Sequence, residues 1–536
     1  MLARTLLTRG VCAALFAAAA IGCEAEIEPA EPSGDTEPDW GTVSGGVAVY
    51  RGIPYAAPPV GELRWREPQP ALASPESYAA KTFANDCMQV RTQIGTLPQG
   101  NLPAEDCLAV NVWRAADLPA DARLPVLVWI YGGAYVNGSS STPLFDGSAF
   151  VDYGLVFVSF NYRLGRFGYF AHPALTRADE GPLGNYGYMD QIAALEWVRD
   201  NITAFNGDPE LVTVMGESAG GASIIDLLSA PQAAGLFHRA IVLSGGGRYF
   251  LGGLTLEQAE PTGTAFAESQ GISGDDSDAL TELRRLYAED VRGDLDFETL
   301  AAESDSYAGG PIIDGQIVRG TADEMFHSGG PASMPILIGT TSEDLSTSSA
   351  ASKDELFATF GEYEEDARET YDPDGTRSLQ ELNQEVGADR SMHEPARFVA
   401  QRMTAMGSPV WLYRFSYVAE EMRPEWSGAP HASELPYLFD TLDLGYEDVT
   451  DRDRAAGLDF RSYIASFASS GAPSNPDMPE WPAYDPDEFA IMNFSPDDGP
   501  VLEIDPWKAR LDVAEETAEE PWEEAGDDEP SGPTEP

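Results

Sequence analysis

The sequence predicts an α/β protein in which a mainly parallel central sheet is covered by helices on both faces. Six short apolar runs, rich in β-branched and aromatic residues, end in glycine or polar turns, as buried parallel strands do. Helical spacing of apolar residues falls between these runs, as at Tyr188, Ile192, Leu195 and Val198. The six predicted strands are Val126–Tyr131, Leu155–Phe160, Val212–Met215, Ala240–Leu243, Ile336–Ile338 and Val410–Phe415.

One large domain accounts for most of the chain. The 536 residues are 43% hydrophobic, which provides a large core. No proline-rich or low-complexity break divides residues 40–510, and we assign this range to a single domain. The stretches 250–310 and 345–400 are more polar and helix-like, so we expect them to be helical insertions around the functional site. Residues 511–536 are acidic and contain proline, which predicts a disordered tail.

The charge of the chain excludes one class of function. It contains 89 acidic and 32 basic residues, for a net charge of −57. A polyanion of this kind repels phosphate backbones and anionic lipid head groups, so nucleic-acid binding is excluded. An acidic surface that is poor in lysine stays hydrated and soluble at high salt, so a saline habitat is one explanation of this composition. An ordinary acidic bias explains it equally well.

The N-terminus predicts export and a lipid anchor. Residues 1–22 combine a short basic segment with an apolar run too short to span a bilayer, as in a signal peptide. Small residues before Cys23 resemble a bacterial lipobox, with Ala20 where leucine is usual. Cys23 would then be lipidated, and the acidic segment 23–39 would link the anchor to the body. The expected location is the cell envelope, on the periplasmic or the outer side. An ordinary secretory signal is the alternative.

The remaining cysteines predict one disulfide. Cys12 lies in the leader, so Cys87 and Cys107 are left as a pair separated by twenty residues. In an oxidising compartment such a pair closes. A loop of this size stabilises the fold by about 3 kcal/mol in the chain-entropy model. A metal site is excluded because neither cysteine has further ligands at the required spacing.

A nucleophile is predicted in the pentapeptide Gly216–Gly220, which has the pattern G-x-S-x-G. It follows the apolar run Val212–Met215 and precedes a helix-compatible segment. A serine on a tight strand-to-helix turn needs small neighbours, because the backbone is strained and the chain packs closely on both sides. This setting projects the Ser218 hydroxyl outward and directs the positive end of the following helix toward an oxyanion.

A second glycine-rich turn follows the strand Val126–Tyr131. Acyl transfer requires backbone N–H groups that reach the tetrahedral oxyanion without obstruction by side chains. The N–H groups of Gly133 and Ala134, together with that of Ala219, are candidates for this oxyanion hole.

The best candidate for the base is His431, one of only five histidines. It follows the strand Val410–Phe415, and it lies downstream of Ser218 as the order serine, acid, histidine of α/β-hydrolases requires. The acid should follow a strand between them, and the run Ile336–Ile338 leads to both Glu343 and Asp344. Its role would be to orient the imidazole and stabilise the imidazolium.

Several separated segments resemble the type-B carboxylesterases, relatives of the cholinesterases, over roughly residues 40–510. Two of them resemble the family's signatures, with Asn206 where glycine or arginine is usual and Ala109 where tyrosine or threonine is usual. The matching segments are Arg51–Ala56, Glu105–Val112, Asn161–Gly165, Asn185–Gln191, Phe205–Pro209, Gly216–Gly220, Phe237–Ile241 and Gly428–Phe439.

The resemblance implies an α/β-hydrolase fold and ester hydrolysis by a Ser-His-acid triad. Ser218 matches the nucleophile, His431 the base and Asp344 the acid, although glutamate is commoner at that position and Glu343 stays an alternative. Gly133, Ala134 and Ala219 match the oxyanion donors of the family. Cys87 and Cys107 match its N-terminal disulfide.

The expected reaction needs no cofactor or metal. Ser218 would attack an ester carbonyl with His431 as base, and water would hydrolyse the resulting acyl-enzyme. The partner would be a small-molecule ester, and contact with a membrane would occur only through the anchor. The alternatives are a non-catalytic adhesion or binding protein on the same fold, and an amidase or lipase with the same triad.

Overall fold

The computed structural model describes residues 40–72, 79–91, 100–248, 251–300, 302–495, 497 and 499–523. The predicted signal peptide 1–22, the linker 23–39 and the lipidated Cys23 lie outside the described residues. Over the ranges that are described, no helix is both long enough and apolar enough to span a bilayer.

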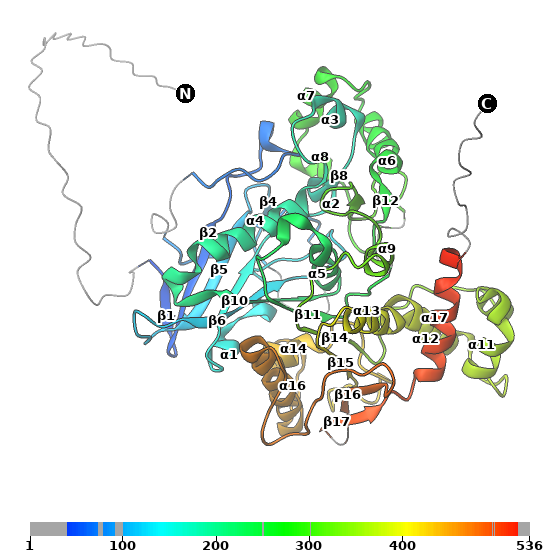
Figure 1. Cartoon of the computed structure of the whole chain (residues 1–536). Helices are drawn as coiled ribbons and strands as arrows, with labels where there is room; N and C mark the ends of the chain where they lie inside the picture. The colour runs from blue at the N-terminus through cyan, green and yellow to red at the C-terminus, as the bar shows by residue number, and fades with distance from the viewer. Residues whose placement is uncertain are drawn as a thin grey trace, which may run out of the picture. The chain divides into compact units, whose positions relative to one another are not determined.

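An eleven-stranded sheet forms the centre of the fold (Figure 1). Its middle, from β7 to β16, is parallel, and the pairs at both edges are antiparallel. In spatial order the strands are β1 (Thr42–Ser44), β2 (Val47–Pro54), β5 (Ala109–Ala115), β7 (Val156–Phe160), β6 (Leu124–Ile130), β10 (Gly207–Glu217), β11 (Arg239–Leu243), β14 (Ile336–Thr341), β15 (Val410–Phe415), β16 (Ala490–Ser495) and β17 (Gly499–Ile504). The six predicted strands correspond to β6, β7, β10, β11, β14 and β15, which confirms the predicted mainly parallel sheet.

Helices cover both faces of this sheet (Figure 1). The apolar repeat that begins at Tyr188 lies in α4, and α4 and α5 pack on β10. On the other face, α1 packs on β5 and β7, and α16 packs on β6 and β10. The helices are α1 (Ser148–Val151), α2 (Gly165–Gly168), α3 (Pro173–Ala178), α4 (Tyr186–Asn201), α5 (Ala219–Ser229), α6 (Leu256–Ser269), α7 (Ser277–Arg285), α8 (Ala288–Arg292), α9 (Ala322–His327), α10 (Lys353–Ala358), α11 (Glu364–Tyr371), α12 (Leu379–Ala388), α13 (Glu394–Ala405), α14 (Leu435–Leu438), α15 (Leu442–Gly445), α16 (Asp451–Ser470) and α17 (Lys508–Glu523).

The parallel register brings several strand ends together. Because neighbouring parallel strands end at the same edge of a sheet, the residues that follow β6, β10, β11 and β14 meet there. Ser218 follows β10, Ser244 follows β11 and Asp344 lies just beyond β14. The site is therefore assembled from short loops on a rigid sheet.

The two helix-rich stretches differ in their relation to the sheet. Residues 250–310 contain α6, α7 and α8, which contact α2, α3 and the short strands β8 (Tyr169–Phe170), β12 (Leu254–Thr255) and β13 (Ile312–Ile313). Residues 345–400 contain α10, α11, α12 and the start of α13. Since α13 packs directly on β14 and β15, the second stretch includes a covering helix of the sheet as well as an insertion.

The predicted disordered tail 511–536 begins too early. Helix α17 continues to Glu523, and Leu511 is buried with Val513 and Ala514 on its inner side. Buried Arg397 forms ion pairs with Asp512 (2.9 Å) and Glu515 (2.6 Å). The acidic composition suggested disorder, but the acids are partnered by arginine and the apolar residues are buried. Residues 524–536 lie outside the described part.

The predicted disulfide is present. Cys87 and Cys107 are bonded and buried, and they join the short strand β3 (Asp86–Cys87) to the segment that leads into β5. The bridge therefore fastens the N-terminal loop to the antiparallel side of the central sheet.

Candidate active site

Ser218 lies on a strained turn between β10 and α5. Its φ of 56° and ψ of −125° lie outside the conformations that non-glycine residues ordinarily adopt. A side chain at Gly216 would overlap the backbone of Gly220, and one at Gly220 would overlap the carbonyl of Ile130. Glycine is therefore required at both positions. The Ser218 N–H donates to the Leu243 carbonyl (2.9 Å), which ties the turn to β11.

The structure brings His431 to Ser218. Its Nε2 lies 3.0 Å from Ser218 Oγ, within hydrogen-bond distance, although the two residues are 213 positions apart. His431 belongs to the loop between β15 and α14. Burial alone would lower the pKa of the imidazole, but the neighbouring carboxylates Glu217 and Asp344 raise it above its ordinary value.

Asp344 lies behind this imidazole and is 1% exposed. Its Oδ1 lies 2.5 Å from His431 Nδ1 and also accepts a bond from the Leu345 N–H (2.7 Å). Its Oδ2 accepts bonds from the Thr341 N–H (3.0 Å) and the Ser244 hydroxyl (2.7 Å). Burial by itself raises the pKa of this carboxyl, but the charge of His431 and these hydrogen bonds lower it well below its ordinary value. Asp344 is therefore an anion that holds the imidazole by one nitrogen.

Glu343, the alternative acid, has a different position. Its carboxylate accepts bonds from the Gly428 N–H (3.0 Å) and the Ser427 hydroxyl (3.0 Å). Its own N–H donates to the Ala429 carbonyl (2.8 Å). Glu343 thus fastens the start of the histidine loop, while its neighbour contacts His431 directly.

Three backbone N–H groups lie beside the serine. Gly133 (φ 109°) and Ala134 (φ 53°) turn the chain sharply after β6, and a Cβ at Gly132 would lie 2.9 Å from the Cβ of Ser218. Ala219 is the first residue of α5, so its N–H has no partner within the helix. Among the described residues, none of the Gly133, Ala134 and Ala219 N–H groups donates a hydrogen bond. They therefore stay candidates for the oxyanion hole.

Two further buried acids surround His431, and the sequence reasoning missed both. Glu217 Oε1 lies 3.2 Å from His431 Nε2, the nitrogen that also faces Ser218. Glu434 is fully buried, and neither of its carboxyl oxygens has a hydrogen-bond partner among the described residues. Burial raises the pKa of each carboxyl group, and the charge of nearby Asp344 raises both pKa values further. The available signals in the sequence were that Glu217 directly precedes Ser218 and that Glu434 lies three positions after His431.

Ser244 was also missed. It has a φ of 46° at the end of β11 and supplies the hydroxyl that binds Asp344. The available signal was its place directly after a predicted strand that neighbours the strand carrying the acid.

The other four histidines have separate roles. His172 caps α3, His238 accepts the Val212 N–H, and His327 contacts Asp323 in α9. His393 is buried against Thr340, and burial lowers its pKa to about 3. Over the described ranges, no group of three or more histidine, cysteine or acidic side chains is arranged to hold a metal ion.

Comparison with known proteins places this site in a family. Residues 33–504 match the model of the carboxylesterase family. The chain is 37% identical over 464 residues to para-nitrobenzyl esterase of Bacillus subtilis, covering 83% of this chain and 90% of that protein. It is 31% identical over 490 residues to fumonisin B1 esterase of Sphingopyxis macrogoltabida, covering 87% of each. With human cocaine esterase it shares 32% identity over 525 residues, covering 89% of this chain and 90% of the relative.

Solved structures of esterases have the same fold as this chain. A structure of PNB esterase superposes with a TM-score of 0.75 at 34% identity, covering 88% of this chain and 97% of that one. A thermophilic PNB esterase gives 0.74 at 32% identity, with the same coverage. The predicted α/β-hydrolase fold is thereby confirmed. This chain belongs to the carboxylesterase family and is a carboxylic ester hydrolase.

Proposed function

We propose that the protein hydrolyses carboxylic esters through an acyl-enzyme on Ser218, with His431 as general base and Asp344 as the orienting acid. The observation that carries this proposal is the continuous contact from Ser218 Oγ to His431 Nε2 and from His431 Nδ1 to the Asp344 carboxylate. Relatives named as esterases of para-nitrobenzyl compounds, fumonisin B1 and cocaine support the ester bond as the shared chemistry.

In the first half-reaction, His431 Nε2 takes the Ser218 proton as Oγ attacks the ester carbonyl carbon. The carbonyl oxygen becomes an oxyanion and receives hydrogen bonds from the Gly133, Ala134 and Ala219 N–H groups. As the tetrahedral intermediate collapses, the bond to the alkoxide breaks and His431 returns the proton to that oxygen.

In the second half-reaction, water replaces the alcohol. His431 takes a proton from the water as its oxygen attacks the acyl carbon, and the proton then returns to Ser218 Oγ. The products are a carboxylic acid, one alcohol and free enzyme, so each turnover consumes one ester and one water. Asp344 keeps its charge throughout, because its role is to hold the imidazole tautomer and to stabilise the imidazolium.

For location, we propose that residues 1–22 direct export and that lipidated Cys23 anchors the enzyme in the cell envelope. The support is the basic and apolar leader followed by small residues and cysteine. The disulfide between Cys87 and Cys107 agrees with an oxidising compartment.

The direct test is Ser218→Ala with Ser229→Ala as its matched control. Both are serines of the α5 region, and the buried Ser229 hydroxyl has no partner among the described residues. Ser218→Ala should abolish turnover of 4-nitrophenyl acetate and labelling by a fluorophosphonate, while Ser229→Ala keeps both. Residual turnover within tenfold of wild type would overturn the assignment of the nucleophile. No turnover and no labelling of the wild-type protein would favour the adhesion alternative, and faster anilide than ester cleavage would favour an amidase.

A further inference from the structure

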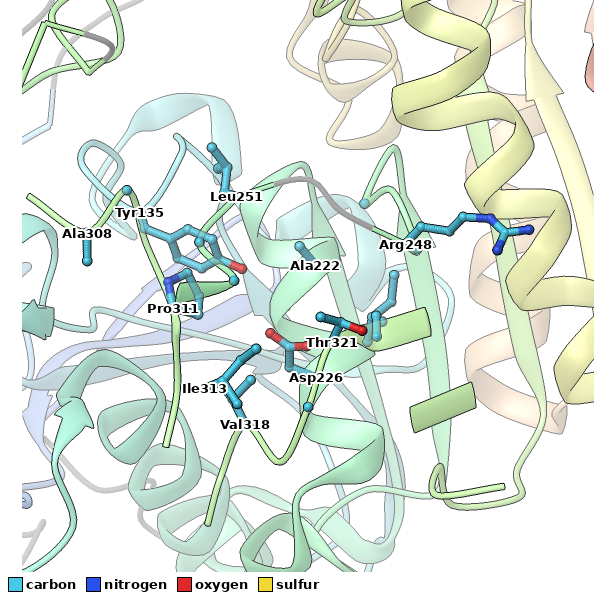
Figure 2. A pocket seen from close by; sticks show the side chains of 18 of the residues that line it. Tyr135, Ala222, Asp226, Arg248, Leu251, Ala308, Pro311, Ile313, Val318 and Thr321 are labelled. Carbon is cyan, nitrogen blue, oxygen red and sulfur yellow. The ribbon is translucent and has the colours of Figure 1, made fainter. Parts of the chain in front are cut away.

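A cavity of about 290 Å³ lies beside the candidate active site (Figure 2). One wall is helix α5, with Ala222, Ile225 and Asp226, and another includes Tyr135. Tyr135 follows Ala134 of the proposed oxyanion hole, and the Ala222 N–H donates to the Ser218 carbonyl one turn into the helix. Ser218 does not itself line the cavity, which extends along α5 from Ala222, one helical turn after the serine.

The position of His431 indicates which half of an ester this cavity receives. The leaving alkoxide must lie within reach of His431 Nε2, because that nitrogen returns the proton. None of the described residues 428–439, which carry His431, lines the cavity. Because the loop that carries His431 takes no part in the cavity, the cavity is assigned to the acyl group and the leaving group to the side of His431.

The lining combines apolar side chains with glycine backbone and the hydroxyl-bearing Tyr135 and Thr321, and it carries one group whose negative charge is available to a ligand. Among the described lining residues, Asp226 is the only carboxylate, and Ile313 and Val318 point toward the same space (Figure 2). The Arg248 guanidinium points away, to ion pairs with Asp323 and Glu394 (Figure 2). A carboxylate in an apolar cavity is costly unless a donor or a cation pairs with it.

Only one of the two carboxylate oxygens of Asp226 accepts a hydrogen bond from the described residues. The Tyr188 hydroxyl, which itself contacts the Tyr135 hydroxyl (2.9 Å), donates to Asp226 Oδ2 (2.7 Å). Asp226 Oδ1 has no hydrogen-bond donor among the described residues, and the side chain is partly accessible from the cavity. Burial raises the pKa of Asp226 to about 6, against the lowering effect of the Tyr188 hydrogen bond, and the nearby Asp314 carboxylate also raises it. The group is therefore largely ionised above neutral pH and has one oxygen open to a cation.

We propose that Asp226 makes the enzyme selective for esters whose acyl chain ends in an ammonium group, which binds Asp226 Oδ1 while the chain lies in the apolar cavity. This inference rests on the proposed function of Ser218. Its basis is the cavity one helical turn after the serine, the apolar side chains in its lining, and the carboxylate of Asp226, of which one oxygen lacks a donor among the described residues. The negative net charge of the chain also attracts cationic substrates.

The helix sets the length of the preferred chain. Asp226 is eight residues after Ser218, which at 1.5 Å per residue is about 12 Å along the axis, and side chains tilt back toward the N-terminus. The distance from the reacting carbon to the carboxylate is therefore about 10 Å. Five methylene groups between the carbonyl and the ammonium, with bonds of about 1.5 Å, span most of it, and the hydrogen bond completes it.

The experiment compares methyl 6-aminohexanoate with methyl heptanoate, whose chains have equal length but end in ammonium and methyl. The ratio of their kcat/KM values is measured at about pH 8, where Asp226 is ionised. Asp226→Asn keeps the shape and the acceptor for Tyr188 but removes the charge. Exposed Asp152→Asn removes one charge far from the cavity lining and serves as the matched control.

In Asp226→Asn the ratio should fall about tenfold or more, the effect of losing a charged hydrogen bond in a partly desolvated site. In Asp152→Asn it should stay at the wild-type value. A ratio that changes less than about twofold in Asp226→Asn, or that falls equally in Asp152→Asn, would overturn the inference. Failure of the proposed function is separate, because wild-type enzyme would then not hydrolyse 4-nitrophenyl acetate through Ser218 at all.

Discussion

Replacing Asp344 by asparagine tests the proposed triad most directly. Four donors converge on this carboxylate: His431 Nδ1, the Thr341 and Leu345 N–H groups, and the Ser244 hydroxyl. An asparagine amide has one oxygen and one NH₂ group, so it cannot accept all four bonds. In either orientation the NH₂ group faces one of the two backbone N–H donors, whose positions are held by the chain.

The two orientations differ in their effect on His431. If the amide nitrogen occupies the Oδ1 position, it donates to His431 Nδ1 and forces the tautomer with hydrogen on Nε2. That tautomer cannot accept the Ser218 proton. The same kind of change in a Ser-His-Asp triad costs about 10⁴-fold in kcat, which corresponds to about 5.5 kcal/mol of transition-state free energy. The lost backbone hydrogen bond should also lower stability, by about 1–3 kcal/mol.

The assay is kcat/KM on 4-nitrophenyl acetate, with urea unfolding of each variant. Glu343→Gln is the matched control, because its amide oxygen can still accept the Gly428 N–H that Glu343 binds. Asp344→Asn should lose about 10⁴-fold, Glu343→Gln should lose less than about tenfold, and Asp344→Glu should retain part of the activity. If Glu343→Gln is the crippled enzyme while Asp344→Asn is nearly normal, the assignment of the acid is wrong.

Three further perturbations test neighbouring parts of the structure. Glu217→Gln removes a negative charge that raises the pKa of His431. The acid limb of the pH profile of kcat/KM should therefore move to lower pH by about one unit or more. A shift to higher pH, or no shift, would contradict this. Gly220→Ala should destabilise the fold by about 3 kcal/mol or more in urea unfolding, because the new methyl overlaps the Ile130 carbonyl. Gly235→Ala is the control, because its new Cβ meets open space. It should lower stability only by the roughly 1–2 kcal/mol that a non-glycine residue loses in the left-handed conformation. Cys23→Ala should release the protein from membranes and stop lipid labelling, and persistent membrane binding would exclude the lipobox.

Local physical requirements made much of the site visible in the sequence. A strained nucleophile turn requires glycine at 216 and 220, and buried parallel strands require continuous apolar runs, so both leave signals within about ten residues. The order of serine, acid and histidine, together with its place after a predicted strand, then favoured His431 as the base. Only the distinction between Glu343 and Asp344 stayed open, because adjacent residues share the same strand end in the sequence.

Composition was a weaker guide. The acidic C-terminal segment predicted disorder, yet residues up to 523 are helical. Arg397, more than a hundred positions upstream, forms ion pairs with Asp512 and Glu515 of this helix, and no pattern within the segment indicates such a partner.

What the sequence predicted by itself was therefore the sheet, the candidate nucleophile and base, the disulfide and the class of chemistry. What only the tertiary structure decided was which acid reaches His431, which buried carboxyl groups surround it, and that Asp226 faces a cavity. The first group depends on steric and burial requirements that each short segment must satisfy alone. The second depends on the direction of single side chains and on partners brought together from distant strands and helices, and the electrostatic environment of a carboxylate exists only after that packing has formed.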